Sequence, residues 1–191
     1  LGHRMPDALA RMVRERGSAA PIVNACDVDP AREIASVRID NAAASAEAMS
    51  LLHSMGHRRV GVIAGPDSPI TAERLRGVRS VAGIEMILDQ ADYTIEQAAR
   101  TVGRMLAGPD RPSAIFCFSD EMALGAMTAA RLAGLRCPAD LSIVGFDDIR
   151  YARHLDPPLT TIRQPMAQIG QEAVKLLMAI LDGSASRVER V

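Results

Sequence analysis

Short, almost wholly apolar runs alternate with longer amphipathic runs through the middle and C-terminal parts of the chain. Uninterrupted apolar runs are typical of strands buried on both faces, and the amphipathic segments between them indicate the helices that cover those faces. The pattern therefore predicts an α/β protein with a parallel sheet. The predicted strands are Pro21–Asn24, Val60–Ala64, Ala114–Phe118 and Leu141–Phe146.

Two helices between these strands are predicted to end at a glycine. Ala42–Met55 is followed by Gly56, and Asp120–Ala133 is followed by Gly134. Glycine adopts the left-handed conformation that a helix C-cap needs. Repeated strand-helix-strand units form right-handed crossovers, and such sheets bind ligands at the carboxyl ends of their strands.

The stretch DPPLTTIRQP at 156–165 interrupts the pattern. Prolines bracket a short β-branched run, which predicts an extended connector between lobes and excludes a central strand. An amphipathic helix is predicted after it, ending before Gly183. Its apolar positions recur at helical spacing: Ile169, Ala173, Leu176, Leu177 and Ile180. Residues 85–91 give no clear pattern.

The composition describes a chain that can bury a substantial core. Its 191 residues are 48% hydrophobic with a mean hydropathy of +0.07, which is too apolar for disorder. No run reaches the roughly 18 apolar residues of a membrane span. The net charge of −1 argues against binding of nucleic acid by this segment itself through phosphate contacts. Three widely spaced cysteines indicate neither a disulfide framework nor a zinc site, so a reducing cytoplasm fits best.

Polar side chains follow each predicted strand. This set is rich in hydrogen-bonding groups and poor in catalytic ones, since the chain has no phosphate-binding glycine loop, nucleophile elbow or H-E-x-x-H helix. The groups are Asn24, the stretch GPDS at 65–68 leading to Arg74, then Ser119 with Asp120, and Asp147 with Asp148.

Asp147 and Asp148 end the last strand and allow three interpretations: an acid and base pair, a metal site, or a clamp for a polar ligand. Adjacent residues of an extended segment point to opposite faces, so the two carboxylates do not converge on one reacting atom. A metal site needs more ligands, and the nearest histidine, His154, lies beyond the turn. A polar cleft remains, in which Asp147 accepts hydrogen bonds from ligand hydroxyls or amino groups and Arg74 donates them.

Architectural roles stay open for several of these residues. Asp147 is otherwise a cap or turn former, and Asp120 and Asp148 are interpreted as helix caps. Ser119 fits either role. Arg74 fits an ion pair with Glu73 equally well, and Tyr93 either stacks on a ligand or fills a gap. His57, in GHRRV, is interpreted as structural, fixing the turn into the next strand.

Seven stretches, in order, resemble the effector-binding domain of the LacI/GalR family of bacterial transcriptional regulators, and two of them lean towards its cytidine-repressor branch. They are VRIDN, GHRRVGVIAGP, RLRG, ADYT, RPSAIFCFSDEMALGA, GLRCPADLSIVGFDDI and DPPLTTIRQPMAQIG. The resemblance implies a periplasmic-binding-protein-like fold of type I, with two Rossmann-like lobes, parallel sheets and a ligand cleft. It divides the chain into a partial N-terminal lobe (1–56), a C-terminal lobe (57–162), a returning segment of the first lobe (163–181) and a C-terminal segment (182–191).

The resemblance also implies which residues contact the effector. By motif position these are Arg74, Tyr93, Ser119 and Asp147, with Asp40 and Gln164 near the cleft and crossover. Two departures bear on Tyr93: Ala91 stands where the family usually has glycine, and the span from Arg74 to Asp92 is short.

The function implied is a non-enzymatic effector-binding and dimerisation domain of a cytoplasmic repressor that senses a small sugar or nucleoside. No cofactor, metal or membrane is expected, and the family binds operator DNA as a homodimer through a helix-turn-helix that is missing from this chain. The start LGHRMPDALA has no initiator Met and no signal core, so we expect further sequence upstream. The alternative is a periplasmic sugar-binding protein of a transporter, which shares the fold.

Overall fold

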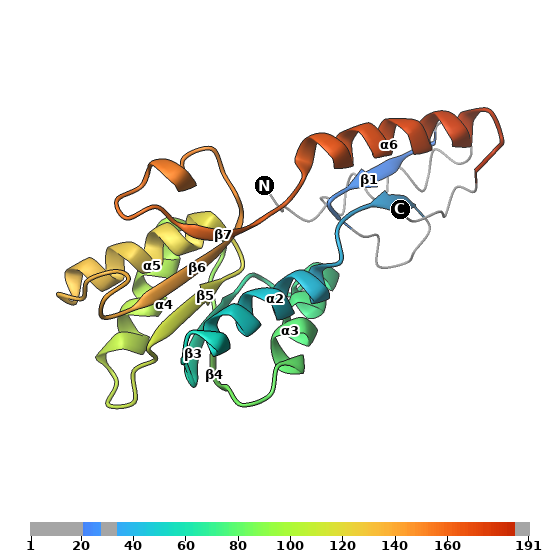
Figure 1. Ribbon diagram of the computed structural model, residues 1–191. Coiled ribbons are helices and arrows are strands. Elements are labelled where there is room, and N and C mark those ends of the chain that lie inside the picture. The colour runs from blue at the N-terminus through green and yellow to red at the C-terminus, as the bar shows by residue number, and fades with distance from the viewer. Residues whose placement is uncertain (1–20, 28–33, 186–191) are drawn as a thin grey trace. The chain divides into compact units, whose positions relative to one another are not determined.

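A computed structural model describes residues 21–27 and 34–185 of the chain (Figure 1). Two compact units form: the first combines Leu1–Ile39 with Pro165–Val191, and the second is the continuous segment Asp40–Gln164. The predicted division put its boundary after residue 56. It differs because the helix that begins at Asn41 packs against elements of the second unit.

The first unit contains two short parallel strands and one long helix. β1 (Val23–Ala25) pairs with β2 (Ala35–Val37), and α6 (Met166–Leu181) packs on both. The small core between them consists of Ala35, Val37, Ile169, Leu176 and Ile180. The predicted C-terminal helix is thereby confirmed. Of its predicted apolar positions, Ile169, Leu176 and Ile180 lie in this core and Ala173 packs against it.

The second unit is built on a five-stranded sheet of order β4-β3-β5-β6-β7, in which every neighbouring pair is parallel. The strands are β3 (Arg59–Ala64), β4 (Glu85–Gln90), β5 (Ala114–Cys117), β6 (Ser142–Asp147) and β7 (Thr160–Arg163). The central strands β3 and β5 are buried almost throughout, as their unbroken apolar runs predict.

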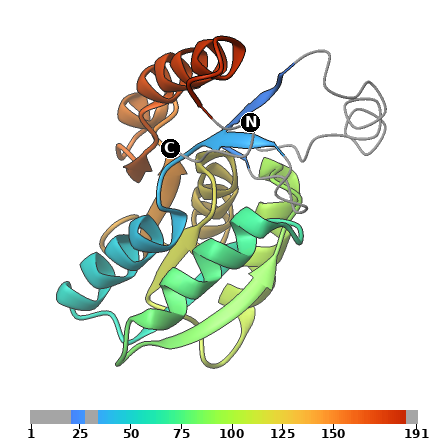
Figure 2. The same ribbon diagram turned by 90° about the vertical axis from the view of Figure 1, so that its right-hand side faces the viewer.

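Four helices cover the two faces of this sheet, in pairs (Figures 1 and 2). One pair is α2 with α3, and the other is α4 with α5. Glycine permits the close approach within each pair, because a Cβ on Gly77 of α3 would overlap the carbonyl of Ala42 in α2, and one on Gly125 of α5 would overlap the Ile95 carbonyl in α4. The helices are α2 (Asn41–Ser54), α3 (Pro69–Ser80), α4 (Ile95–Ala107) and α5 (Asp120–Leu132), and a 3-10 turn, η2 (Ala152–His154), precedes β7.

The two edge strands have different sequence signatures. β7 lies at one edge beside β6 and comes from the stretch bracketed by prolines, which was excluded from the sheet centre. β4, at the other edge, forms from residues for which the pattern predicted nothing. Its polar residues Glu85, Asp89 and Gln90 are accommodated because this strand is only half-buried.

His57 links the amino ends of strands β3, β5 and β6 through hydrogen bonds. Its Nδ1 lies 2.8 Å from the Ser113 hydroxyl before β5, and its Nε2 lies 3.0 Å from the Ser142 hydroxyl at the start of β6. Burial lowers the pKa of the His57 ring below its ordinary value. The predicted structural role of His57, at the entry to β3, is confirmed.

No helix among the described residues is long and apolar enough to cross a membrane. Within the same part of the chain, no three His, Cys, Asp or Glu side chains gather in a way that could hold a metal ion.

Candidate functional site at the carboxyl edge of the sheet

The candidate residues gather at one edge of the second unit, where the parallel strands end. Asp147 ends β6, Ser119 follows β5, and Gln164 follows β7. Arg74 lies on α3, the helix after β3, and Tyr93 follows β4. Parallel strands deliver their carboxyl ends to the same edge, and α/β proteins bind ligands there.

Asp147 is half-buried and has an unusual backbone conformation, with φ of +119°. Its Oδ1 accepts a hydrogen bond of 2.6 Å from the side-chain amide of Gln164, whereas its Oδ2 accepts none from the described residues. Burial raises the pKa of the Asp147 carboxyl, while the Gln164 hydrogen bond and the positive charge of Arg74 act in the opposite direction. Asp147 thus presents one carboxylate oxygen that can accept a hydrogen bond from a ligand.

Arg74 is buried, with 6% of its surface exposed, and is held from three sides. Its Nε donates to the Asn41 side chain at 2.9 Å, and its Nη1 donates to the Phe118 carbonyl at 2.5 Å. The guanidinium carbon lies 3.6 Å from the centre of the Phe146 ring, a cation–π contact. These contacts fix the guanidinium between the ends of β5 and β6, next to Ser119 and Asp147.

Ser119 caps α5. Its hydroxyl oxygen accepts a hydrogen bond of 3.1 Å from the Met122 amide, as an N-cap residue does. Ser119 is buried, at 6% exposure, and its hydroxyl keeps its own proton for donation. Capping and ligand contact are therefore compatible at this residue.

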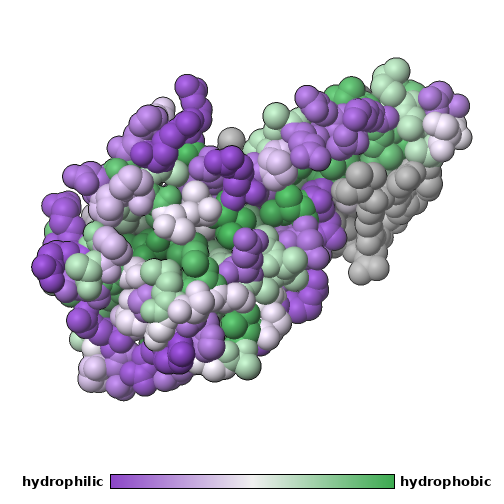
Figure 3. All heavy atoms as spheres, in the orientation of Figure 1, coloured by the Kyte–Doolittle hydropathy of each residue, from purple (hydrophilic) through white to green (hydrophobic). Residues whose placement is uncertain are grey.

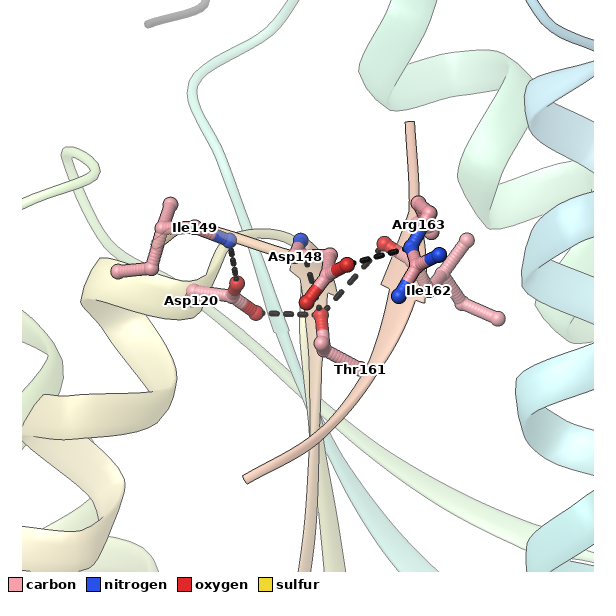
Figure 4. Close-up of polar contacts among 6 residues, drawn as sticks. All are labelled: Asp120, Asp148, Ile149, Thr161, Ile162 and Arg163. Atoms are coloured by element: carbon pink, nitrogen blue, oxygen red, sulfur yellow. Dashed lines mark hydrogen bonds and ion pairs between the residues drawn. The ribbon is translucent and has the colours of Figure 1, made fainter. Parts of the chain in front are cut away.

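The interpretation of Asp120 as a helix cap is wrong, because Ser119 occupies that position. The Asp120 side chain is fully buried and joins two other segments instead (Figure 4). It accepts hydrogen bonds from the Ile149 amide at 2.8 Å and from the Thr161 hydroxyl at 2.5 Å. Burial raises the pKa of the Asp120 carboxyl, although both hydrogen bonds act to lower it.

Asp148 does not cap a helix either, and it holds the turn that follows β6. Its carboxylate accepts a hydrogen bond of 2.5 Å from Nε of Arg163 on β7, which forms an ion pair (Figure 4). The Asp148 amide donates to the Thr161 hydroxyl at 3.4 Å. Both contacts tie the turn to the neighbouring edge strand.

Tyr93 lies against the end of β3. A Cβ on Gly65 would overlap its ring and hydroxyl, so the glycine leaves room for the aromatic side chain. The Tyr93 hydroxyl is 3.5 Å from the Thr71 hydroxyl, and its backbone is left-handed with φ of +67°. Tyr93 therefore joins the edge from the β4 side despite the short connection.

Asp40 is exposed and caps α2, accepting hydrogen bonds from the amides of Ala42 and Ala43. A hydrogen bond joins Asp147 to Gln164, and Arg74 acts on the Asp147 carboxyl through its positive charge. Arg74 also donates to the carbonyl of Phe118, the residue before Ser119. Tyr93 lies against the end of β3, and Asp40 precedes Asn41, which accepts from Arg74. Sequence reasoning missed two partners of Arg74, Asn41 and Phe146, and it missed Thr161, the partner of Asp120. Asn41 stands in the motif VRIDN and Phe146 in GFDD, so both motifs contained the signal.

The sequence matches the periplasmic binding protein-like domain family over residues 49–191. It is 40% identical to the HTH-type transcriptional repressor CytR of Escherichia coli (strain K12) over 96% of the chain and 55% of that protein. The fold matches the crystal structure of a LacI-family regulatory protein from Chloroflexus aggregans with a TM-score of 0.86 and 32% identity, covering 100% of this chain and 70% of the other.

The chain belongs to the LacI family. A further match is the transcriptional regulator CelR in complex with cellobiose, with a TM-score of 0.86, 32% identity, and coverage of 99% of this chain and 60% of CelR. The match to CytR is consistent with the cytidine-repressor branch that the motifs indicate. The chain spans about half the length of this curated LacI-family repressor.

The candidate site combines one accepting carboxylate with buried and half-buried donors. No candidate residue contacts another in the manner of a nucleophile and its base: Asp147 is bonded to an amide, and the Ser119 hydroxyl to a backbone amide. This geometry is suited to recognition of a polar molecule by hydrogen bonds.

Proposed function

We propose that this chain is the effector-binding and dimerisation domain of a LacI-family transcriptional repressor, and that the effector is a small sugar or nucleoside. The observation that carries the proposal is the carboxylate of Asp147, half-buried at the end of β6. One of its oxygens is held by Gln164, and the other accepts no hydrogen bond from the described residues.

The chemistry of the edge supports this class of ligand. Sugars and nucleosides carry adjacent hydroxyl or amino groups that donate to a carboxylate, and they carry oxygens or ring nitrogens that accept from donors. Asp147 supplies the acceptor, the Ser119 hydroxyl supplies a donor, and Tyr93 offers an aromatic face on which a sugar or base stacks. Cellobiose bound to CelR is an example of such a polyol on a similar fold.

The partners follow from the same assignment. On the face of the second unit seen in Figure 3, hydrophobic residues gather near the middle, with hydrophilic residues around them. We assign this surface to contacts within a homodimer. We assign operator binding to a helix-turn-helix outside the chain, since CytR is named an HTH-type transcriptional repressor. On this proposal the protein acts in the cytoplasm as a regulator without enzymatic activity. The similarity to transcriptional regulators favours this function over a transporter's sugar-binding protein.

Calorimetric titration of the 191-residue chain tests the proposal. The panel contains cytidine, adenosine, ribose, galactose and cellobiose, and the chain is compared with Asp147→Asn. The substitution keeps the shape but replaces one accepting oxygen by a donor, so a ligand donor meets an amide donor. We expect affinity for the best ligand to fall by roughly 30- to 1000-fold, equivalent to about 2–4 kcal/mol.

Asp182→Asn is the matched control, because it makes the same chemical change at an exposed residue beyond the end of α6, outside the candidate site. The Asp182 side chain accepts a hydrogen bond from the Ser184 amide, and Asn makes such a turn contact about as well as Asp, so stability should hardly change. Equal affinity of the wild type and Asp147→Asn would remove Asp147 from the binding site. If the wild type binds no member of the panel, the result would count against the sugar or nucleoside class.

A further inference from the structure

Two consecutive residues where β6 passes into the following turn have left-handed backbones although neither is glycine. Asp147 has φ of +119° and Asp148 has φ of +56°. Side chains with a Cβ rarely adopt such conformations, which persist only where surrounding contacts hold them. The conformation of Asp147 determines where its carboxylate points, so the contacts that hold this turn also determine the geometry of the candidate site.

Asp120 supplies the central contact. It is the first residue of α5, and its side chain reaches from that helix to the turn and to β7 (Figure 4). Oδ2 accepts from the amide of Ile149, which is the first residue after the two left-handed ones, and Oδ1 accepts from the Thr161 hydroxyl. Thr161 in turn accepts from the Asp148 amide. The Asp120 carboxylate therefore holds the turn through the Ile149 amide and links it to the edge strand β7 through Thr161.

The surroundings of Asp120 are shaped around this carboxylate. The side chain has 0% exposure, so water does not compete for its hydrogen bonds. Gly145 lies in β6 immediately beside it, and a Cβ at that position would overlap Asp120 Oδ1. The strand that ends in Asp147 thus has a glycine at the position where Asp120 approaches it.

We propose that Asp120 is a positioning residue for effector binding: through Ile149 and Thr161 it holds Asp147 in the left-handed conformation that presents its carboxylate. The proposal rests on the proposed function of Asp147 and adds a residue that does not itself contact the effector. It assigns to the buried carboxylate a geometric role, fulfilled by two accepted hydrogen bonds, and not a role for its charge.

This distinction gives the conservative substitution a definite expectation. In Asp120→Asn the side-chain oxygen still accepts from the Ile149 amide, and the side-chain NH2 donates to the Thr161 hydroxyl, which is able to accept. Asn therefore preserves both links and removes only the charge. Asp120→Ala removes both hydrogen bonds of this side chain. Of these two, Thr161→Val removes only the one between Asp120 and Thr161.

The test uses NMR spectroscopy and calorimetry on the 191-residue chain and its Asp120→Ala, Asp120→Asn and Thr161→Val variants. The HN–Hα coupling constant of Asp147 is small at its φ and large in extended backbone, so it reports the turn without any ligand. The titration uses cytidine, adenosine, ribose, galactose and cellobiose. His57→Gln is the control, since it alters two hydrogen bonds at the amino ends of the strands, the opposite edge of the same sheet.

We expect Asp120→Ala to raise the Asp147 coupling constant and to weaken binding of the best ligand by about tenfold or more. Thr161→Val should change the coupling constant and the affinity in the same directions as Asp120→Ala, but by a smaller amount. Asp120→Asn should leave the coupling constant unchanged and the affinity within about threefold of wild type. His57→Gln should lower stability and leave both readouts unchanged.

Three results would overturn the proposal. The first is a folded Asp120→Ala with an unchanged coupling constant, and if that variant does not fold, an unchanged coupling constant in Thr161→Val decides in the same way. The second is an Asp120→Asn variant that loses as much ligand affinity as Asp120→Ala, because the charge of Asp120, and not its hydrogen-bonding geometry, would then support binding. The third is a shifted turn with unchanged affinity. If the wild type binds no member of the panel, the role assigned to Asp147 fails, while the coupling constants still decide whether Asp120 holds the turn.

Discussion

Replacing Gly65 by alanine should force Tyr93 out of its place at the end of β3. A Cβ built on Gly65 would meet three atoms of the Tyr93 side chain, Cζ, Oη and Cε1, all closer than atoms of folded proteins approach. The ring must move aside to admit the methyl group, while hydrogen bonds between Asp92 and Thr94 hold the backbone of this segment.

Two opposing effects determine how far Gly65→Ala changes the free energy of unfolding. Overpacking of a methyl group typically costs about 1–3 kcal/mol of unfolding free energy. Replacing glycine by alanine at a compatible backbone restricts the unfolded chain and returns about 0.4–1 kcal/mol. Gly65 has no positive φ, so that gain applies. We expect Gly65→Ala alone to destabilise the chain by about 0.5–2 kcal/mol.

A double-mutant cycle isolates the contact. In the Tyr93→Ala background the obstacle is absent, so Gly65→Ala should be neutral or stabilising by up to about 1 kcal/mol. The coupling free energy between the two positions should therefore be about 1–3 kcal/mol. Urea unfolding of the four proteins, followed by circular dichroism, measures it. A coupling below about 0.3 kcal/mol would refute the contact between Gly65 and Tyr93.

The remaining predictions concern charge and pH. Burial lowers the pKa of His57 when the chain folds, so its contribution to stability is present above 6.5 and is lost as pH falls below that value; urea midpoints of His57→Gln should lack this loss. Burial raises the pKa of Asp120, so folding disfavours its charged form; any stability advantage of Asp120→Asn at neutral pH should shrink as acid protonates the wild-type carboxyl, which paired melts at neutral and acidic pH would reveal. Arg74→Lys should cost about 1–3 kcal/mol in unfolding free energy, because an ammonium does not reproduce the planar contacts with Asn41 and Phe146.

The elements that the sequence predicted well are those whose environment is uniform. Val60–Ala64 and Ala114–Phe118 are apolar at every position because helices cover both faces of the central strands, and Gly56 and Gly134 have the positive φ expected beyond helix ends. β4 escaped prediction because an edge strand tolerates polar residues on its open side. β2 escaped it because a three-residue strand is too short to show a period.

The candidate site was predictable to the extent that strand ends determine it. Asp147 was found because a buried run ends there. Asp120 was misread because Asp at the start of a helix is usually a cap, and the sequence does not show that its side chain turns towards Thr161, far away in the chain. The support of Arg74 by Phe146 and Asn41 comes likewise from tertiary packing, which local patterns do not reveal.

The continuous course of the second unit, Asp40–Gln164, between the two segments of the first has a consequence for folding order. β1 and β2 gain their partner α6 only after the chain has returned from the whole second unit, so the first unit must close a long loop. The entropic cost of closure rises by about 0.6 kcal/mol with each doubling of loop length. α2 and β7, next to the two ends of the second unit, contact each other once it is folded. Folding of the second unit therefore shortens the effective loop, and we expect the first unit to consolidate after it.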